Sequence, residues 1–357
     1  MAFALILLVA AGCAASTKLM QRYALSRSLL DIPNERSSHS VATPRGGGLA
    51  IAGFVVIGLV VGAAAGWIGG RLALALGGGA VLVSVIGFID DHRNTPAALR
   101  LTVHAAAAVW ALWLLGGLPW LTVGSVDVHL GAAGSVLALV GIIWSINLYN
   151  FMDGIDGLAA GEGTSVGLIA ALLLIAAQAP GLALVAALIA AACGGFLAWN
   201  WAPAKIFMGD VGSGLLGYLF AVLAISAENM GSLPLMTFVI LLGGFVFDAT
   251  VTLARRIIHG EAWYEAHRRH AYQRAVQSGW SHGRVTTAFV IVNVALGALA
   301  AIAWAWPWTF GPVAAAAVFL LCVPYLLIER RRPMMGARPR AAAAEPVHGR
   351  RRQRAAS

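Results

Sequence analysis

Long apolar stretches dominate this sequence and restrict it to a membrane fold. Eleven of them, each of about 17–22 residues, are bounded by charges, Asn or clusters of Gly and Pro. They begin near Ala2, Gly47, Leu72, Ala97, Gly134, Leu158, Leu182, Ser213, Leu233, Val285 and Gly311. Only 11% of the residues are charged, against about 25% in an ordinary soluble domain, so the chain lacks the polar surface to cover a water-soluble core. We predict an all-α polytopic membrane protein with about eleven transmembrane helices.

The basic residues fall almost entirely on one side of this arrangement. Of the 24 Lys and Arg residues, 23 lie in loops after odd-numbered spans or in the C-terminal tail, and Arg71 is the exception. Because positive residues accumulate in cytoplasmic loops, this distribution predicts an N-terminus outside and a C-terminus in the cytoplasm. The net charge of +9 is then mainly a topological signal, and we do not expect nucleic-acid binding.

The spans and loops also define the expected domain organisation. Residues 1–328 form a predicted membrane domain, and residues 329–357 form a basic, disordered cytoplasmic tail. The apolar run Ala2–Ala15 lacks the preceding basic residues of a signal peptide, so we interpret it as a retained first helix. The alternating pattern of Pro119–Gly131 predicts a small hairpin outside. The loops that carry unusual polar residues are 17–46, 90–97, 147–158, 203–213 and 255–284.

A pair of carboxylates ends the third span. Asp90 and Asp91 are followed by Asn94, and a carboxylate at bilayer depth costs about 2.5–3.5 kcal/mol unless it has a partner. Adjacent carboxylates repel each other unless a cation compensates them, so the pair suits a site that handles phosphate and a divalent cation. Capping of the next helix before Pro96 is the alternative explanation.

The segment between the fifth and sixth spans is dense in amides and carboxylates. Asn147, Asn150 and Asp153 recur every three residues, which would place them on one face if the helix extends that far. Asp153 and Asp156 are each followed by Gly, whose backbone can approach a ligand closely. Helix capping and turn chemistry are the alternative.

A glycine-rich segment precedes the eighth span. It places Gly209, Asp210 and Ser213 at a helix start, which offers N–H donors and a hydroxyl to phosphate oxygens and a carboxylate to Mg²⁺. Lys205 would supply compensating positive charge. Alone this motif resembles a simple turn, but together with two further Asp clusters on the same face it indicates a phosphate site.

The first cytoplasmic loop offers cations to an anionic ligand. Arg36, His39 and Arg45 could contact a lipid headgroup or a diphosphate, although a topological role is the competing explanation.

The fifth cytoplasmic loop contains the run from His267 to His270, with Arg268 and Arg269 between them. Such a group could neutralise charge that develops on a leaving group. The HxxH spacing could also bind zinc, but the oxygen ligands of the other loops favour Mg²⁺ or Mn²⁺. Asp248, about two turns before Arg255, is expected to pair with an Arg.

Taken in order, the motifs PNxRxxH…TPRGGG, DDxxN, NxxNxxDGIDGL, FMGDxGS and the late His/Arg loop resemble those of the polyprenyl-phosphate N-acetylhexosamine-1-phosphate transferases. The resemblance runs from about Leu30 to His282. It implies a transfer of sugar 1-phosphate from a UDP-N-acetylhexosamine to undecaprenyl phosphate, with release of UMP and a requirement for Mg²⁺. It also implies a multi-pass protein of the bacterial inner membrane whose active site faces the cytoplasm, and it leaves room for a homodimer.

The resemblance assigns roles residue by residue. Asp90 and Asp91 would position or deprotonate the lipid phosphate, and the two histidines would contact the diphosphate or sugar. The implied catalytic residues are Asp90, Asp91, Asp153, Asp156, Asp210, His267 and His270. The implied metal ligands are Asp91, Asp153 and Asp210. The implied substrate-binding residues are Arg36, His39, Arg45, Asn94, Asn147, Asn150, Lys205, Gly209, Ser213, Arg268 and Arg269.

Departures from the family pattern narrow the expected pathway. Asn94 stands where the peptidoglycan enzymes usually have Lys, and the HxxH spacing replaces their tight His-rich motif. The loop is more similar to the branch that initiates O-antigen or exopolysaccharide synthesis, and the sugar stays open. A transporter or flippase for a sugar-linked substrate is the alternative function, but it predicts polar residues through the whole bilayer rather than on one face.

Overall fold

The computed structural model describes residues 1–27, 30–32, 41–93, 95–261 and 267–335. Within these ranges the chain is a bundle of helices, as expected for an all-α protein. Two short antiparallel strand pairs are the only strands in the described part of the chain. The elements are α1 (Ala2–Ser26), β1 (Leu30–Asp31), β2 (Thr43–Pro44), α2 (Gly48–Ala64), α3 (Gly70–Arg93), α4 (Ala97–Leu115), β3 (Trp120–Val123), β4 (Val126–His129), α5 (Ala132–Met152), α6 (Leu158–Ala176), α7 (Pro180–Asn200), α8 (Asp210–Asn229), α9 (Leu235–Leu241), α10 (Gly243–Ile258), α11 (Ala271–Gln277), α12 (His282–Ala305), the 3₁₀ turn η1 (Pro307–Thr309) and α13 (Phe310–Arg331).

The predicted spans correspond to helices. In the described ranges, nine helices are long and apolar enough to cross a membrane, and α9 with α10 would make a tenth, broken at a 79° bend. The remaining predicted span matches α2, which is apolar but has only 17 residues. Every predicted span begins within three residues of the start of a helix. The polytopic all-α fold is confirmed, whereas the number of eleven stays a prediction.

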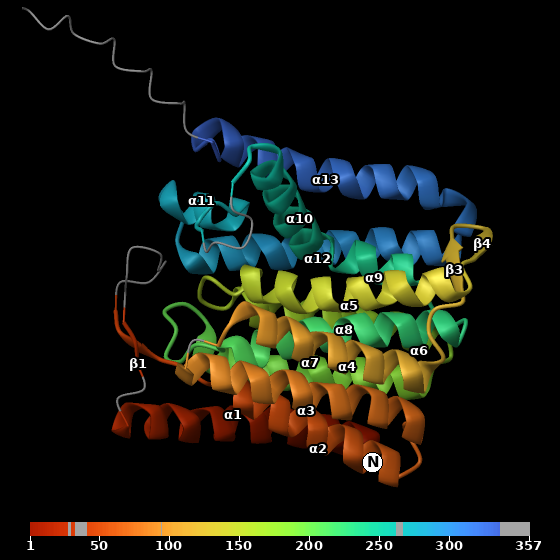
Figure 1. Ribbon diagram of the computed structural model, residues 1–357, viewed down its shortest axis with the longest axis horizontal. Coiled ribbons are helices and arrows are strands. Elements are labelled where there is room, and N and C mark those ends of the chain that lie inside the picture. Colours follow the sequence, from red (N-terminus) through yellow and green to blue (C-terminus); the bar gives the residue numbers. More distant parts are fainter. Residues whose placement is uncertain (28–29, 33–40, 94, 262–266, 336–357) are drawn as a thin grey trace, which may run out of the picture.

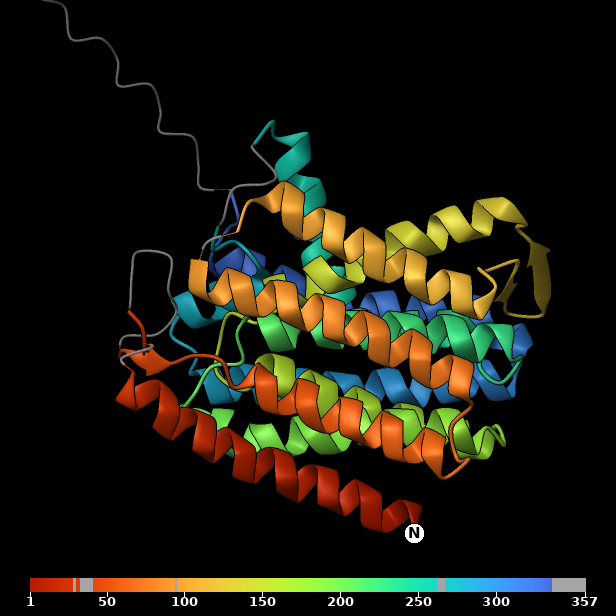
Figure 2. The ribbon, with the colours of Figure 1, turned by 60° about the horizontal axis from the view of Figure 1, so that its bottom comes forward.

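The helices lie side by side and define two ends of the bundle (Figure 1). We call the end that carries β1, α11 and the segments after α3, α5 and α7 the polar end. The β3–β4 hairpin lies at the opposite end, and the N-terminus lies at that end too, on another side of the bundle. α13 finishes at the polar end, and the turned view shows the same arrangement (Figure 2). The start of α1 and the end of α13 thus lie at opposite ends of the bundle (Figure 1). The charge distribution predicts that the polar end is cytoplasmic.

The hairpin predicted within Pro119–Gly131 is present. β3 pairs with β4 from Trp120 opposite His129 to Val123 opposite Val126. The carboxylate of Glu228, at the end of α8, accepts the backbone N–H of Thr122 at 2.8 Å and so fastens the hairpin to the bundle.

The centre of the bundle is α8, the most deeply buried of the spans in the described part of the chain. α3 crosses it closely at two glycines. A Cβ on Gly79 would overlap the hydroxyl of Tyr218, and a Cβ on Gly87 would lie 2.6 Å from the backbone nitrogen of Val211. Glycine therefore lets the last turn of α3 reach the first turn of α8, which brings two of the polar motifs together.

The end of α13 is tied to the rest of the polar end. Glu329 accepts two hydrogen bonds from Arg255 of α10, both at 2.9 Å, and a further one from Arg274 of α11. α13 continues to Arg331, past residue 328, and the domain boundary predicted there stays a prediction. Residues 336–357, most of the predicted tail, lie outside the described ranges.

Candidate active site

The carboxylate of Asp91 caps the N-terminus of α8. It accepts the backbone N–H of Asp210 at 3.1 Å and that of Val211 at 3.4 Å. Gly209, with φ +73°, makes this contact possible, because a Cβ there would lie 2.4 Å from Asp91 Oδ2. The positive end of the helix dipole stabilises the buried carboxylate. The DD pair and the GDxGS motif are thus parts of one site, as the sequence predicted.

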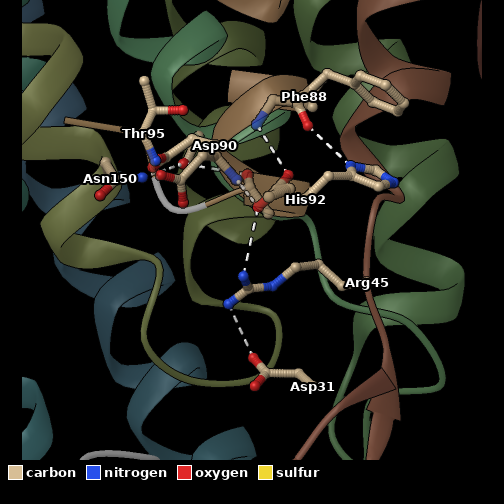
Figure 3. Close-up of polar contacts among 12 residues, drawn as sticks. Asp31, Arg45, Phe88, Asp90, His92, Thr95 and Asn150 are labelled. Atoms are coloured by element: carbon tan, nitrogen blue, oxygen red, sulfur yellow. Dashed lines mark hydrogen bonds and ion pairs between the residues drawn. The ribbon is translucent and has the colours of Figure 1, made fainter. Parts of the chain in front are cut away.

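Arg45 joins the first cytoplasmic loop to this site. Its guanidinium donates to Asp31 at 2.9 Å and lies 3.5 Å from Asp91 (Figure 3). Burial alone would lower the pKa of Arg45, but the carboxylates of Asp31, Asp91 and Asp210 outweigh that effect and raise it. Arg45 therefore stays a fixed cation at the edge of the carboxylate cluster.

Main-chain hydrogen bonds hold the segment around Arg45 against the GDxGS segment. Phe207 N–H donates to the carbonyl of Pro44 at 2.8 Å, and the N–H groups of Gly47 and Gly48 donate to the carbonyls of Phe207 and Met208, each at 2.9 Å. A Cβ on Gly48 would overlap the backbone of α8. The glycines of TPRGGG thus allow two backbones to meet, which places Arg45 beside the start of α8.

Asp90 faces α4 rather than the first loop. It accepts the backbone N–H of Thr95 at 2.6 Å and a hydrogen bond of 2.5 Å from Arg100, whose guanidinium also lies 3.6 Å from Asp210. From the sequence, Arg100 was expected to act only as one of the positive charges that set the topology. Its place ten residues after Asp90, on the helix that follows the DD pair, is the signal that could have identified it.

The second motif meets the same cluster from α5. Asn147 and Asn150 line a small pocket together with Asp210, and the amide of Asn150 donates to Ser213 at 3.1 Å. The amide of Asn147 donates to Ile143 in its own helix at 2.7 Å. The predicted shared face therefore holds for the two asparagines.

Asp153 lies one residue beyond the end of α5. Burial raises its pKa well above the usual value, and the charges of Asp210, Asp91 and Asp156 raise it further, while Arg45 opposes them. This excess of carboxylate is the arrangement that a divalent cation would relieve.

Asp156 points to a different set of partners. Its carboxylate accepts the N–H of Ala204 at 3.1 Å and lies 3.3 Å from Nδ1 of His282, and its carbonyl accepts the hydroxyl of Thr286 at 2.9 Å. Asp156 therefore links the DGIDG segment to the α7–α8 segment and to α12. His282 was not assigned to the site from the sequence, because a lone histidine at a helix start gives no indication of its partner.

The HxxH segment is positioned by Asp248 of α10. The Asp248 carboxylate accepts the N–H groups of Ala271 at 2.8 Å and Tyr272 at 3.1 Å, and it lies 3.5 Å from Nδ1 of His270. It thus caps α11. The hydroxyl of Tyr272 donates to the carbonyl of Phe151 at 3.0 Å, which docks the loop on the end of α5.

His267 lies beside His270, with ring centroids 4.9 Å apart. Burial lowers the pKa of His267 to about 3, with a further contribution from the neighbouring His270 and the nearby arginines. Arg269 forms an ion pair with Glu261, and the carbonyl of Arg268 accepts the amide of Gln277 at 3.0 Å. His267 is therefore a neutral imidazole in this structure near pH 7.

Lys205 was expected to compensate the negative charge of the carboxylates, but the structure places it elsewhere. Its ammonium lies over the ring of Trp199 at 5.3 Å, beside Lys18 of α1 over the same ring, and it forms no ion pair with any described residue. The cations that the structure places at the cluster are Arg45 and Arg100 instead. The predicted contacts of Arg36, His39 and Asn94 lie outside the described residues.

The carboxylates at the polar end offer the oxygen ligands that Mg²⁺ prefers. Among the described residues, however, no group of three or more His, Cys, Asp or Glu side chains is arranged to hold a metal ion by itself. Mg²⁺ commonly takes one or two carboxylates and completes its shell with water and substrate phosphate. The residues therefore fit a cation that is bound together with a phosphate ligand, rather than a preformed metal cage.

The fold and site define a polytopic membrane protein with a carboxylate and arginine cluster at one end of its bundle. The model of glycosyl transferase family 4 matches residues 73–228. The chain is 32% identical to a probable undecaprenyl-phosphate N-acetylglucosaminyl 1-phosphate transferase of Bacillus subtilis, covering 74% of this chain and 75% of that protein. It is 32% identical to a decaprenyl-phosphate N-acetylglucosaminephosphotransferase of Mycobacterium tuberculosis, covering 81% and 78%. It is 30% identical to a phospho-N-acetylmuramoyl-pentapeptide-transferase of Picosynechococcus, covering 71% and 72%. The chain belongs to glycosyl transferase family 4.

Proposed function

We propose that this protein transfers an N-acetylhexosamine 1-phosphate from a UDP-sugar to a polyprenyl phosphate and releases UMP. The observation that carries the proposal is the contact of Asp91 with the N-terminus of α8 beside Arg45. It joins three segments that are far apart in the sequence into one cluster of carboxylates, a guanidinium and helix N–H groups, which could bind both a cation and a phosphate. The names of the relatives describe the same class of transfer.

In the proposed reaction, an oxygen of the lipid phosphate attacks the β-phosphorus of the UDP-sugar. A phosphorus–oxygen bond forms to the lipid phosphate, the bond between the β-phosphorus and the bridging oxygen breaks, and UMP leaves with that oxygen. A lipid phosphate is already anionic near neutral pH, so orientation and charge stabilisation carry most of the acceleration. Mg²⁺, or Mn²⁺ in its place, would supply charge neutralisation at the diphosphate, held by Asp210 with Asp91 and Asp153.

The chain's own residues fill distinct places in this scheme. Arg45 and Arg100 hold positive charge on two sides of the carboxylates, and both keep hydrogen-bonding groups in a position to meet phosphate oxygens. Asp248 fixes His270, so that the HxxH segment faces the end of α5. His267 and His270 would contact the sugar or the leaving diphosphate.

The proposed setting is the bacterial inner membrane, with the polar end in the cytoplasm and initiation of a surface polysaccharide, such as O-antigen, as the pathway. The charge asymmetry of the loops supports the orientation. N-acetylglucosamine is the first donor sugar to test, since the names of the Bacillus and Mycobacterium relatives contain it.

The direct test is lipid mass spectrometry of purified protein incubated with undecaprenyl phosphate, Mg²⁺ and a panel of UDP-N-acetylhexosamines. We expect a polyprenyl diphosphate sugar and equimolar UMP with one donor, and loss of both after chelation by EDTA and recovery with added Mg²⁺. The Asp210→Asn variant should be at least about 100-fold slower, as expected when a charge-positioning group is lost. Uptake of a sugar nucleotide into vesicles without UMP release would support the transporter alternative and refute the proposal.

A further inference from the structure

A small cavity lies between α3, α4, α5 and α8, one to two turns inside the polar end. It measures about 40 Å³, room for roughly three water molecules and too little for a sugar ring or a nucleoside. Its polar lining residues are Arg100, His104, Asn147, Asn150 and Asp210. A single tetrahedral anion would match both its size and its donors.

Among the described polar residues that line the cavity, His104 carries a buried ring nitrogen without a hydrogen bond. Its side chain is only 9% exposed, and its Nδ1 atom is buried without a hydrogen bond to any described residue. Leaving a buried polar atom unpaired is unfavourable, so such an atom points to a ligand that the protein alone does not supply. Arg100 lies one turn earlier on α4, and the two side chains therefore share the face of the helix that lines the cavity.

The rest of the lining is apolar. The cavity is completed by three groups of residues: Val83, Ile86 and Gly87 of α3, Ile146 and Phe151 of α5, and Gly214 of α8. All belong to helices that are long and apolar enough to cross a membrane, so the cavity lies among the candidate spans rather than at the loop that carries Arg45. An anion that arrives on an isoprenoid chain is the ligand that suits a phosphate-sized polar pocket among bilayer helices.

We propose that His104, with Arg100, binds the phosphate of the acceptor lipid. The proposal rests on the proposed function and deepens it, because it assigns the acceptor phosphate to a subsite on α4. An imidazole nitrogen donates to a phosphate oxygen, and the guanidinium of Arg100 has donors beyond the one that contacts Asp90. Asp210 closes the cavity on the side of the GDxGS segment, where the transfer would take place.

The first experiment measures binding without turnover. Radiolabelled undecaprenyl phosphate is bound to the purified protein without nucleotide and displaced by unlabelled undecaprenyl phosphate, undecaprenol or inorganic phosphate. We expect His104→Ala to weaken binding of the phosphate lipid about tenfold, the size of one lost buried hydrogen bond, and to leave binding of undecaprenol unchanged. His104→Gln, which keeps a donor, should recover part of the loss. His129→Ala makes the same change on the exposed hairpin at the opposite end and should match wild type.

The second experiment separates the two substrates in the transfer assay. His104→Ala should raise KM for undecaprenyl phosphate about tenfold and change KM for the UDP-sugar by less than about twofold. Unchanged lipid binding and acceptor KM in a folded His104→Ala protein would overturn the inference, as would a rise confined to the UDP-sugar KM. Displacement by inorganic phosphate as effective as by the lipid would also overturn it. If wild type binds the lipid phosphate but forms no product with any donor, the proposed function fails while the subsite stands.

Discussion

The contact between Gly209 and Asp91 gives the sharpest test of the site. Gly209 has φ +73° and ψ 175°, a region that only glycine adopts readily, and a Cβ there would lie 2.4 Å from Asp91 Oδ2. Gly209→Ala therefore adds backbone strain of about 1–3 kcal/mol. It also displaces a carboxylate that accepts two N–H groups of α8, each worth about 1.5–3 kcal/mol as a charge-assisted bond.

Partial relaxation will reduce the sum, so we expect Gly209→Ala to lower the free energy of unfolding by about 4 kcal/mol and the transfer rate by at least about 100-fold. Gly231→Ala is the matched control, because Gly231 also has a positive φ, +63°, but its Cβ would meet no atom within 4 Å. It should show the strain alone and normal activity. Unfolding can be followed by titration with denaturing detergent in mixed micelles, and transfer by UMP release.

A double-mutant cycle tests whether the contact with Asp91 causes the loss of stability in Gly209→Ala. In an Asp91→Ala background the carboxylate is gone, so Gly209→Ala should cost only its own backbone strain. Equal costs of Gly209→Ala with and without Asp91, or a Gly209→Ala enzyme with normal rate and stability, would refute the account of this contact.

Three further predictions follow from charge and topology. Because the pKa of Asp153 is raised in the folded state, this carboxyl group destabilises the fold increasingly as pH rises above the usual carboxyl range. Asp153→Asn should therefore raise the melting temperature at pH 7 and change it little near pH 4. The same variant should lose transfer activity. The pKa of His267 is lowered to about 3, so stability is lost as pH falls from about 6.5 towards 3, and His267→Gln should remove that part of the acid sensitivity in thermal melts. An alkaline phosphatase fusion at Gly124 should be active and one after Arg332 inactive; the reverse pattern would invert the proposed orientation.

The helical spans were predictable because their cause is local. A stretch of about 20 apolar residues must satisfy its backbone as a helix in a bilayer, so each predicted start lies within a few residues of a real one. The meeting of Asp91 with Asp210 was also expected, since both motifs fall at the same predicted membrane face. The break between α9 and α10 was not predicted, because both halves are part of one apolar stretch.

The failures concern which side chains pair across helices. Lys205 and Arg100 are both cations near Asp motifs in the sequence, yet Lys205 packs on Trp199 and Arg100 binds Asp90. Asp248 was expected to pair with an Arg, but the described contacts join it to the start of α11 and to His270. These outcomes depend on helix rotation and on the bend before α10, which charge and spacing along the chain do not encode.

Main-chain hydrogen bonds between the TPRGGG and FMGD segments would let the side chains around the site change without moving its parts. Because these three hydrogen bonds join only backbone groups, exchanging neighbouring side chains does not remove them. Arg45 and the start of α8 therefore keep their relative position while loops such as HRRH change around them. Attempts to change which donor sugar is used should concentrate on the HRRH segment and leave the glycines of TPRGGG unchanged.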